Sequence, residues 1–454
     1  MHSETSSSVF HIGLDDTDSS DGMCTTFLTF NLVKILLRHK GTRLLDYPNL
    51  IRLNPNIPWK TRGNAALVIR LETTMMEEKD IFKICYRQLR KFATSKRANS
   101  GLVVFKGEKI PQSVVEFSRR ALFEVQSLSR AKEILEKEEG FRYVGLRNKQ
   151  GLVGALAGIG NELKDDYTFE LIAYRKSCKK KRIIDKRKVV AMDRKTRFET
   201  FNCYDEVNDR ILIAPHGPDP VLLGIRGETP LAVKNAFRML LPIKNLSGYI
   251  VFRSNQGTGE HLKEFLDLSH VKAYTSGRVK GVVSSKPSMA QGGHTYFELK
   301  NDQGGIPCAA YEPTGRFRLK VLSLVVGDLI EVGGGIRKGT STHPKILNLE
   351  YMIPRKLVSL LLESNPKCPR CFGPMDSEGK EKGYECRHCG YRSNMLSKSS
   401  TLKERELTEN RLYLPDLKAH RHLTKPLQRF LLKKIKDKRI GAEENYLVED
   451  WISA

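Results

Sequence analysis

Apolar and polar positions in the first part of the chain follow two different periods. Short apolar runs predict buried strands at residues 9–14, 65–72 and 102–105. Apolar residues at helical spacing predict helices over residues 25–38, 78–94 and 114–137. Strands that alternate with helices are typical of an α/β sheet. We therefore expect an α/β domain over residues 1–135.

A second unit of strands and helices is expected over residues 136–268. Strands are predicted at residues 166–175, 211–214 and 248–253, and a helix at 229–241 with Thr229 as its N-cap and Pro230 in its first turn. The run from Gly151 to Gly160 is small and apolar, which permits close approach of a helix to a sheet or of the backbone to a ligand. This order of elements suits a ferredoxin-like domain.

The segment from Arg175 to Arg197 interrupts this second unit. It holds twelve Lys and Arg residues against two acidic residues, Asp185 and Asp193. Such charge runs are usually solvated loops between strands. The alternative interpretation is a loop that contacts phosphate groups.

From residue 273 onward the pattern becomes purely β. Strands are predicted at residues 273–284, 294–300, 306–311, 329–333 and 346–351, separated by Gly-rich turns. Five short strands over this length suggest a small barrel at 269–356, either an OB-fold, which is a common nucleic-acid platform, or another small β-barrel.

Two Cys-x-x-Cys motifs predict a zinc ribbon over residues 365–392. The cysteines are Cys368, Cys371, Cys386 and Cys389, and their spacing is that of a closed, structural four-cysteine site. Such a site stabilises a fold and leaves no position open for catalysis. His388 lies inside the second motif and is expected to face the surface or a base. Together with Arg370 and Arg387, it would make the ribbon a candidate RNA contact.

The remaining residues, 393–454, are expected to form a basic helical tail. Ten Lys and Arg residues lie between Arg411 and Arg439, and apolar residues from Leu423 to Ile435 would form a helical stripe. The stripe is expected to pack against the protein, and the charged face suits RNA phosphate.

Composition points to a polyanionic partner. The chain has 454 residues and a formal charge of +25, and such an excess usually accompanies nucleic-acid binding, although a merely basic protein is the simpler alternative. Its length requires several domains. The sequence has no run of 18 apolar residues and no secretory signal. Of its nine cysteines, an odd number, four form a metal-binding pattern and five are scattered, which is typical of a cytosolic protein and not of a disulfide framework. We expect a cytoplasmic protein without a membrane partner.

The chemistry is expected at the end of the first strand, where Asp15, Asp16 and Asp18 precede a helix that begins near Thr25 and Thr26. Clustered carboxylates suit Mg²⁺, and a helix N-terminus suits a phosphate. The stretch therefore predicts a nucleotide site without a Walker loop. The alternative is a turn whose Asp and Ser side chains cap the helix.

Five blocks of sequence resemble the archaeal isoleucine-tRNA 2-agmatinylcytidine synthetases, in the same order. They are 12–18 with 22–26 (IGLDDTD, GMCTT), 151–160 (GLVGALAGIG), 214–220 (APHGPDP), 224–228 (GIRGE) and 421–426 (RHLTKP). The resemblance covers nearly the whole chain, except the first residues and the basic segment 175–197. It favours the OB-fold for the barrel.

The resemblance implies an ATP-dependent ligase that joins agmatine to C2 of the wobble cytidine of an isoleucine tRNA, so that the anticodon reads AUA. In the family a threonine of a kinase-like first domain receives the γ-phosphoryl group of ATP, and the C2 oxygen of the cytidine is activated through a phosphorylated intermediate. That threonine corresponds to Thr25. Asp15, Asp16 and Asp18 would hold Mg²⁺ and act on the threonine and on water, with Thr26 and His216 as further candidates for Mg²⁺ and ATP binding.

The agmatine and tRNA sites are less defined in the sequence. Asp219 and Glu228 are candidates for agmatine because carboxylates bind guanidinium groups, although each also suits a structural turn. Arg421, His422 and Lys425 are candidate tRNA contacts, and no DNA partner is expected. A non-catalytic RNA-binding protein is the alternative, but it leaves the carboxylates unused. No P-loop and no lysine nucleophile motif is present, which argues against those ATPase and ligase mechanisms.

Overall fold

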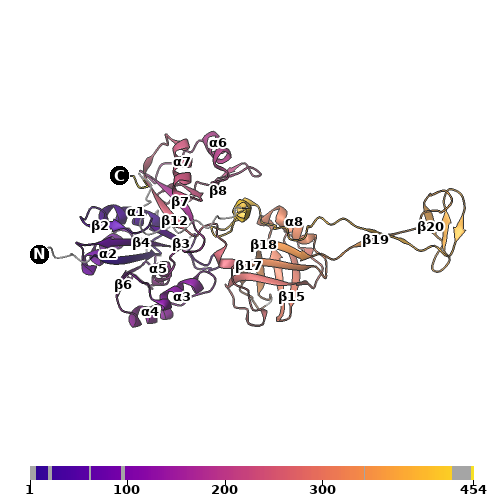
Figure 1. The fold of residues 1–454 in the computed structure, drawn as a ribbon, viewed down its shortest axis with the longest axis horizontal. Helices are drawn as coiled ribbons and strands as arrows, with labels where there is room; N and C mark the ends of the chain where they lie inside the picture. The colour runs from indigo at the N-terminus through magenta and orange to yellow at the C-terminus, as the bar shows by residue number, and fades with distance from the viewer. Residues whose placement is uncertain are drawn as a thin grey trace.

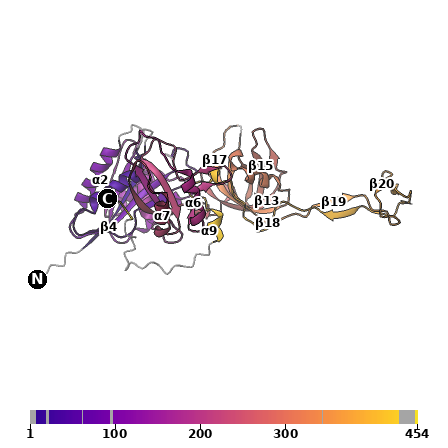
Figure 2. The same ribbon diagram turned by 90° about the horizontal axis from the view of Figure 1, so that it is seen from above.

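The computed structural model describes residues 7–18, 23–60, 63–93, 98–341, 343–431 and 451–453. Figure 1 shows a large α/β body, a β-barrel beside it, and a small β-rich unit at the end of a two-stranded arm. Figure 2, seen from above, shows the same extended arrangement. The mixed multidomain α/β architecture predicted from the sequence is confirmed.

The body is built on one ten-stranded sheet with the order β6-β5-β1-β4-β3-β12-β7-β11-β8, with β2 paired to β4. Its strands are β1 (Ser8–Asp15), β2 (Thr42–Leu44), β3 (Asn49–Arg52), β4 (Ala65–Thr73), β5 (Gly101–Lys106), β6 (Phe141–Gly145), β7 (Thr168–Arg175), β8 (Thr200–Phe201), β11 (Val221–Gly227) and β12 (Leu246–Ser254). The parallel pair β3–β12 joins the two expected α/β units into a single sheet. A site can therefore form across their junction.

Seven helices cover this sheet in the part of the chain that the structure describes. They are α1 (Thr25–Leu36), α2 (Glu78–Phe92), α3 (Gln112–Ala121), α4 (Leu128–Lys137), α5 (Gly151–Gly160), α6 (Lys186–Thr196) and α7 (Pro230–Leu240). Phe10, Ile12 and Leu14 of β1 enter one core with α1 and α2, and α3, α4 and α5 enclose a second core on the other face. Since side chains alternate along a strand, Asp15 follows Gly13 onto the α5 face. Thr229 caps α7 as predicted, accepting from the backbone N–H of Ala232 at 3.1 Å.

Two predictions about helices in the body are wrong. The single helix expected at 114–137 is broken at 122–127 because the carbonyls of Ala121 and Phe123 accept hydrogen bonds from Asn54 and Ser276 instead of from a following helical turn. The basic segment is not a loop throughout. It contains α6, which Asp185 caps and which buries Val189, Met192 and Thr196 on one face.

Short elements connect the two ends of the body. Strands β9 (Tyr204–Asp205) and β10 (Arg210–Ile211) form a small hairpin, and the 3₁₀ turns η1 (Glu260–Leu262) and η2 (Leu268–His270) lead to the barrel. The strand expected at 211–214 is wrong beyond Ile211. Ile213 and Ala214 instead line a cavity described below.

Five strands close into the predicted barrel. They are β13 (Ser276–Val283), β15 (Thr295–Asn301), β16 (Gly304–Ala310), β17 (Leu329–Arg337) and β18 (Ile346–Lys356), and β13–β15 pairing completes the order β13-β17-β18-β16-β15. Strand β14 (Ser288–Met289) extends β15, and η3 (Glu312–Thr314) and α8 (Arg316–Leu322) lie between β16 and β17. β16 and β18 run parallel, and the other barrel pairs are antiparallel.

Beyond the barrel, β19 (Leu361–Ser364) and β23 (Ser399–Leu402) form the arm, and β20 (Met375–Ser377), β21 (Tyr384–Cys386) and β22 (Arg392–Ser393) form its tip. The chain then returns along the barrel, where Tyr413 pairs with Met352. Within 411–431 the structure shows only η4 (Leu417–Ala419) and α9 (Leu427–Leu431), so the expected helix is wrong over 411–426. Residues 432–450 of the predicted tail lie outside the described residues.

Three C-terminal residues pack back onto the body. Ile452 pairs with Ile250, and the carbonyl of Trp451 accepts a hydrogen bond from Val251 of β12. The nine cysteines all fall within the described ranges, and none forms a disulfide. In the described part of the chain, no helix has the length and apolar character needed to cross a membrane.

Candidate active site

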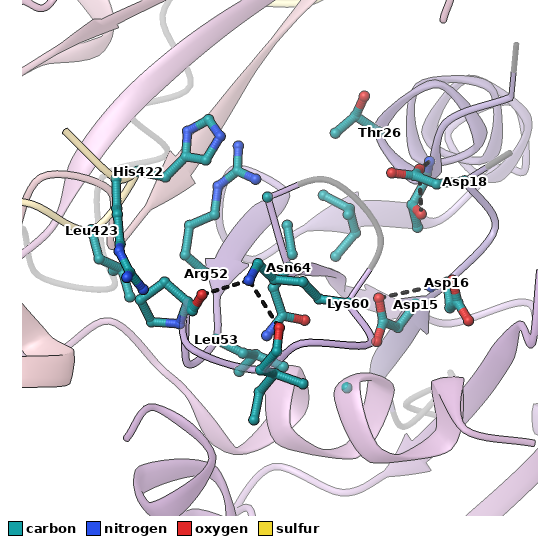
Figure 3. A pocket seen from close by; sticks show the side chains of 18 of the residues that line it. Asp15, Asp16, Asp18, Thr26, Arg52, Leu53, Lys60, Asn64, His422 and Leu423 are labelled. Carbon is teal, nitrogen blue, oxygen red and sulfur yellow. Dashed lines mark hydrogen bonds between the residues drawn. The ribbon is translucent and has the colours of Figure 1, made fainter. Parts of the chain in front are cut away.

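A cavity of about 870 Å³ lies where the sheet of the body, the loops at 53–60 and 121–126, and the returning C-terminal segment meet (Figure 3). Each of the five sequence blocks contributes lining residues. They include Asp15, Asp16, Asp18, Thr25 and Thr26; Gly151, Val153 and Gly154; Ala214, Pro215, Gly217 and Asp219; Gly224 and Arg226; and Arg421, His422 and Leu423. Segments up to four hundred positions apart therefore form one site.

The three carboxylates lie together at one end of the cavity, at the end of β1. Asp16 has a positive φ of 54°, and its carboxylate accepts a hydrogen bond from the backbone N–H of Asn99 at 3.1 Å. Its own N–H donates to Asp15 Oδ1 at 2.7 Å. Burial and the neighbouring charges of Asp16 and Asp18 raise the pKa of Asp15 well above its ordinary value. A bound cation would relieve this repulsion, and oxygen ligands of this type fit Mg²⁺.

Thr25 lies beside these carboxylates in the first turn of α1. Its side chain is 4% exposed, and its hydroxyl donates to Asp18 Oδ1 at 3.2 Å and accepts from the Thr17 hydroxyl at 3.0 Å. Asp18 also accepts from the backbone N–H of Thr25 at 2.8 Å, so the capping interpretation holds for this residue. The Ser and Asp residues at 19–21 and Gly22 lie outside the described residues. Thr26 also lines the cavity, and its hydroxyl lies 2.8 Å from Cys24 Sγ.

The small residues of α5 allow Asp15 to occupy this position. A Cβ atom at Gly154 would overlap the carboxylate of Asp15, and one at Gly151 would overlap the backbone of Gly101 in β5. A Cβ at Gly13 would likewise overlap the carbonyl of Ala155. The glycines thus serve close packing of helix on sheet, one of the two uses expected of this block.

A second charged group lies across the cavity. Arg52 of β3 and Arg226 of β11 flank Glu170 of β7, at 4.0 Å and 3.3 Å. Gln256 also donates to the Glu170 carboxylate. Burial lowers the pKa of Arg52 to about 10, although Glu170 favours its charged form. Two guanidinium groups share one carboxylate, which leaves net positive charge facing the cavity.

His422 completes this group from the C-terminal segment. Its Nδ1 lies 3.1 Å from Gln256 Oε1 and 3.4 Å from an Arg226 nitrogen. Burial and the charges of Arg52 and Arg226 hold the pKa of His422 well below its usual range. Its ring is therefore neutral and acts as a hydrogen-bonding wall of the cavity.

The two agmatine candidates and His216 occupy different places. Asp219 lines the cavity, is 3% exposed, and pairs with Arg182 at 3.1 Å. Glu228 does not line the cavity, and its carboxylate accepts hydrogen bonds from Arg429 of α9. His216 is exposed to solvent, its Nε2 lies 2.6 Å from a guanidinium nitrogen of Arg210, and it is also absent from the cavity lining. The structure therefore brings only Asp219 of these three to the carboxylates.

The candidate tRNA contacts near the C-terminus fasten the returning segment to the body and the barrel. Arg421 lines the cavity and pairs at 3.3 Å with Glu350 of β18, whose other oxygen lies 2.9 Å from His261. Charge from Arg421 and His261 lowers the pKa of Glu350 to about 2 despite its burial. Lys425 pairs with Asp166 at 3.1 Å.

The four predicted zinc ligands come together at the tip of the arm. All four sulfur atoms lie within 4.8 Å of one another, and three pairs lie at 3.4–3.6 Å. Tetrahedral zinc–thiolate bonds of about 2.3 Å place sulfurs about 3.8 Å apart, so the cluster fits zinc. Arg370, Arg387 and His388 are exposed around it, with Arg387 paired to Asp376.

Arg52, Glu170 and Arg226 were not predicted as site residues. Each is a charged residue on a strand whose neighbours are mostly buried. A charge at such a position is costly unless it is paired or functional, which is the signal that could have identified these three residues.

Three family models match this chain. They are the TiaS TCKD domain over residues 11–146, the TiaS FLD domain over 149–261 and the TiaS C-terminal zinc ribbon domain over 365–407. A curated relative, the isoleucine-tRNA 2-agmatinylcytidine synthetase TiaS of Cenarchaeum symbiosum (strain A), is 39% identical over 425 residues, which cover 92% of each chain.

Solved structures agree over the same length. The crystal structure of TiaS in complex with its isoleucine tRNA and ATP matches with a TM-score of 0.82 and 32% identity, covering 94% of this chain and 98% of that one. The crystal structure of TiaS with the same kind of tRNA, AMPCPP and agmatine matches with a TM-score of 0.78 and 30% identity over the same shares.

Proposed function

This chain belongs to the TiaS family of isoleucine-tRNA 2-agmatinylcytidine synthetases, and we infer from that membership that it joins agmatine to C2 of the wobble cytidine of an isoleucine tRNA, using ATP. The observation that carries this proposal is the convergence of the five sequence blocks on one cavity. The binding-protein alternative is not favoured because it gives the clustered carboxylates and Thr25 no task.

We propose that Thr25 is the phosphoryl acceptor. Its oxygen forms the new bond to the γ-phosphorus of ATP, the bond from the γ-phosphorus to the β,γ bridging oxygen breaks, and ADP leaves with that oxygen. The proton of the Thr25 hydroxyl passes to a carboxylate. Asp18 is placed for that transfer, since it accepts a hydrogen bond from the Thr25 hydroxyl at 3.2 Å. Asp15 and Asp16 would hold Mg²⁺, which supplies charge neutralisation. The N-terminus of α1 and Thr26 would contribute donors to phosphate oxygens.

The opposite wall suits the other substrates. Arg52 and Arg226 present guanidinium groups to the cavity and are suited to phosphate oxygens of the nucleotide or of the RNA backbone. Asp219 remains our candidate for the cationic amine substrate. Glu228 and His216 fit binding roles less well, because one is neutralised by Arg429 and the other lies outside the lining.

Topology supports finer domain assignments. The order β12-β7-β11-β8, with α6 and α7 as connections, is that of a ferredoxin-like unit. The closed five-stranded order, with one parallel pair and α8 between the third and fourth strands, is that of an OB-fold. We propose a kinase-like first domain, a ferredoxin-like second domain, the OB-fold over 269–356, a zinc ribbon over 365–392 and a C-terminal segment over 393–454. The boundary expected between 135 and 136 moves toward the C-terminus, because α4 runs to Lys137, β6 pairs with β5, and α5 packs on the first unit. We also propose that the protein acts in the cytoplasm.

The test is transfer of labelled agmatine into RNA. The protein is incubated with ATP, Mg²⁺ and agmatine, with an isoleucine tRNA that carries a wobble cytidine or with the same tRNA carrying uridine there. We expect label only in the cytidine tRNA and only with ATP. Tight tRNA binding without transfer to either RNA would contradict the proposed reaction.

Removal of the zinc site is expected to weaken tRNA binding without disabling ATP chemistry. In Cys368→Ser the fold of the tip is lost, because a closed site contributes folding energy directly. Loss of one or two phosphate contacts there weakens tRNA binding roughly tenfold. ATP turnover in the absence of tRNA is retained, since the cavity lining holds no residue of 365–393 and the arm separates the tip from the body (Figure 1).

The control is Cys178→Ser, which removes an exposed cysteine outside the cluster and changes no charge. Zinc content, measured on both variants, falls only in Cys368→Ser. Equal tRNA affinity in the two variants would show that the ribbon does not contact the RNA.

A further inference from the structure

The basic segment, taken here without the buried strand residue Arg175 as residues 176–197, has two faces with different partners. On α6, Val189, Met192 and Thr196 are buried in the body, so residues on the opposite side of the helix face outward. Nine cations of the segment are exposed: Lys176, Lys179, Lys180, Lys181, Lys186, Arg187, Arg194, Lys195 and Arg197. Arg175, which precedes the segment, is buried, and Arg182 is partly buried.

The exposed cations are largely unneutralised. Lys186 pairs with Asp209, and none of the other eight has an ion pair among the residues that the structure describes. Asp185 serves as the N-cap of α6, and Asp193 is partly buried. The outer face therefore presents eight positive charges over a short stretch of chain, which is the electrostatic character of a polyanion-binding surface.

On its inner side, the segment contacts the loop at 217–221, which forms part of the wall of the cavity. Arg182 donates to the carbonyls of Gly217, Asp219 and Val221 at 2.7–2.9 Å. Arg175 donates to the carbonyls of Pro218 and Asp219 at 2.6–2.9 Å. Gly217, Asp219 and Val221 themselves line the cavity. One loop thus contacts these two arginines on one side and the cavity on the other, so the basic segment adjoins the site of reaction.

We propose that the outer face of segment 176–197 is a docking surface for the tRNA phosphodiester backbone close to the modified nucleotide. The proposal rests on the proposed function, because a nucleotide that enters the cavity brings its flanking phosphates to this wall. Arg187 and Arg194 lie seven residues apart, two turns along the exposed side of α6 and about 10 Å from each other along its axis. Two long cationic side chains at such a spacing can each reach a different phosphate of one backbone.

The test compares tRNA affinity across a series of KCl concentrations for three full-length proteins. They are the wild type, the surface variant Lys179→Gln/Lys181→Gln/Arg187→Gln/Arg194→Gln, and a control, Lys83→Gln/Arg87→Gln/Arg90→Gln/Lys91→Gln. The control removes four exposed cations from α2, which lies near the N-terminus (Figure 1). Both variants lose the same charge, so a difference between them reports position and not net charge.

We expect the surface variant to bind tRNA roughly tenfold or more weakly at physiological salt and to flatten the plot of log K against log[salt] by about 0.9 for each lost duplex contact. Agmatine transfer at saturating tRNA stays near the wild-type rate, because the cavity residues are intact. Equal slopes in the two variants would overturn the proposal. So would loss of binding to phosphatidylserine vesicles with unchanged tRNA binding, which would assign the surface to a membrane.

The two proposals fail separately. If the wild type binds tRNA but transfers no agmatine, while only the surface variant shows the flatter plot of log K against log[salt], the proposed reaction is wrong and the docking surface stands. If the wild type transfers agmatine and the two variants behave alike, the docking surface is wrong and the reaction stands.

Discussion

Thr25→Ala is expected to abolish agmatine transfer, with a fall of at least about a thousandfold, as for other covalent acceptors. The substitution removes the only atom of this residue that can form a bond to phosphorus. It also removes one hydrogen-bond partner each from Asp18 and Thr17. The loss of these two hydrogen bonds costs about 2 kcal/mol of stability, at about 1 kcal/mol each, too little to unfold the body. tRNA affinity stays unchanged, since the contacts proposed for RNA lie elsewhere.

Thr25→Ser is the matched control because it restores the hydroxyl at the same place. We expect measurable transfer in the serine variant and none in the alanine variant. A second readout is label from γ-labelled ATP that stays on the protein when tRNA is omitted; it should appear in the wild type and be missing in Thr25→Ala. Transfer by the alanine variant at a rate close to that of the wild type would exclude Thr25 as the acceptor.

Sequence patterns predicted the elements whose determinants are local. The strand that ends at Asp15, the helix that begins at Thr25 and the Thr229 cap each depend on neighbours within a few residues. The barrel strands were predicted for the same reason, since alternation and Gly-rich turns are local signals. The clustering of Asp15, Asp16 and Asp18 followed from their adjacency.

Features that depend on distant partners were missed or wrong. The break at 122–127 requires Asn54 and Ser276 to reach carbonyls in the middle of the expected helix. Glu228 looked free to bind a cation, but Arg429, 201 positions away, already binds it. The group of Arg52, Glu170 and Arg226 exists only because β3, β12, β7 and β11 are neighbours in one sheet. None of these pairings leaves a periodic signal in a single sequence.

Asp16→Asn is expected to lower the rate of ATP turnover without lowering the stability of the fold. Asp16 has a positive φ, a conformation that Asn tolerates well, and the amide oxygen of Asn can still accept the hydrogen bond from Asn99. The loop therefore keeps its shape while one negative charge is lost. Mg²⁺-dependent ATP turnover should fall by about a hundredfold or more, the range typical for loss of one group that stabilises charge in a transition state.

The stability of the same variant should be unchanged or higher. The charge of Asp16 raises the pKa of Asp15, so its removal lowers that pKa and relieves repulsion in the protein without a bound cation. The melting temperature is measured with and without Mg²⁺ and ATP. We expect the wild type to gain stability when both are added and Asp16→Asn to gain little. If the carboxylates only stabilise a turn, Asp16→Asn would give the opposite result: a lower melting temperature with ATP turnover intact. Reduced turnover with undiminished stability is therefore the combination that identifies carboxylates held together for a cation.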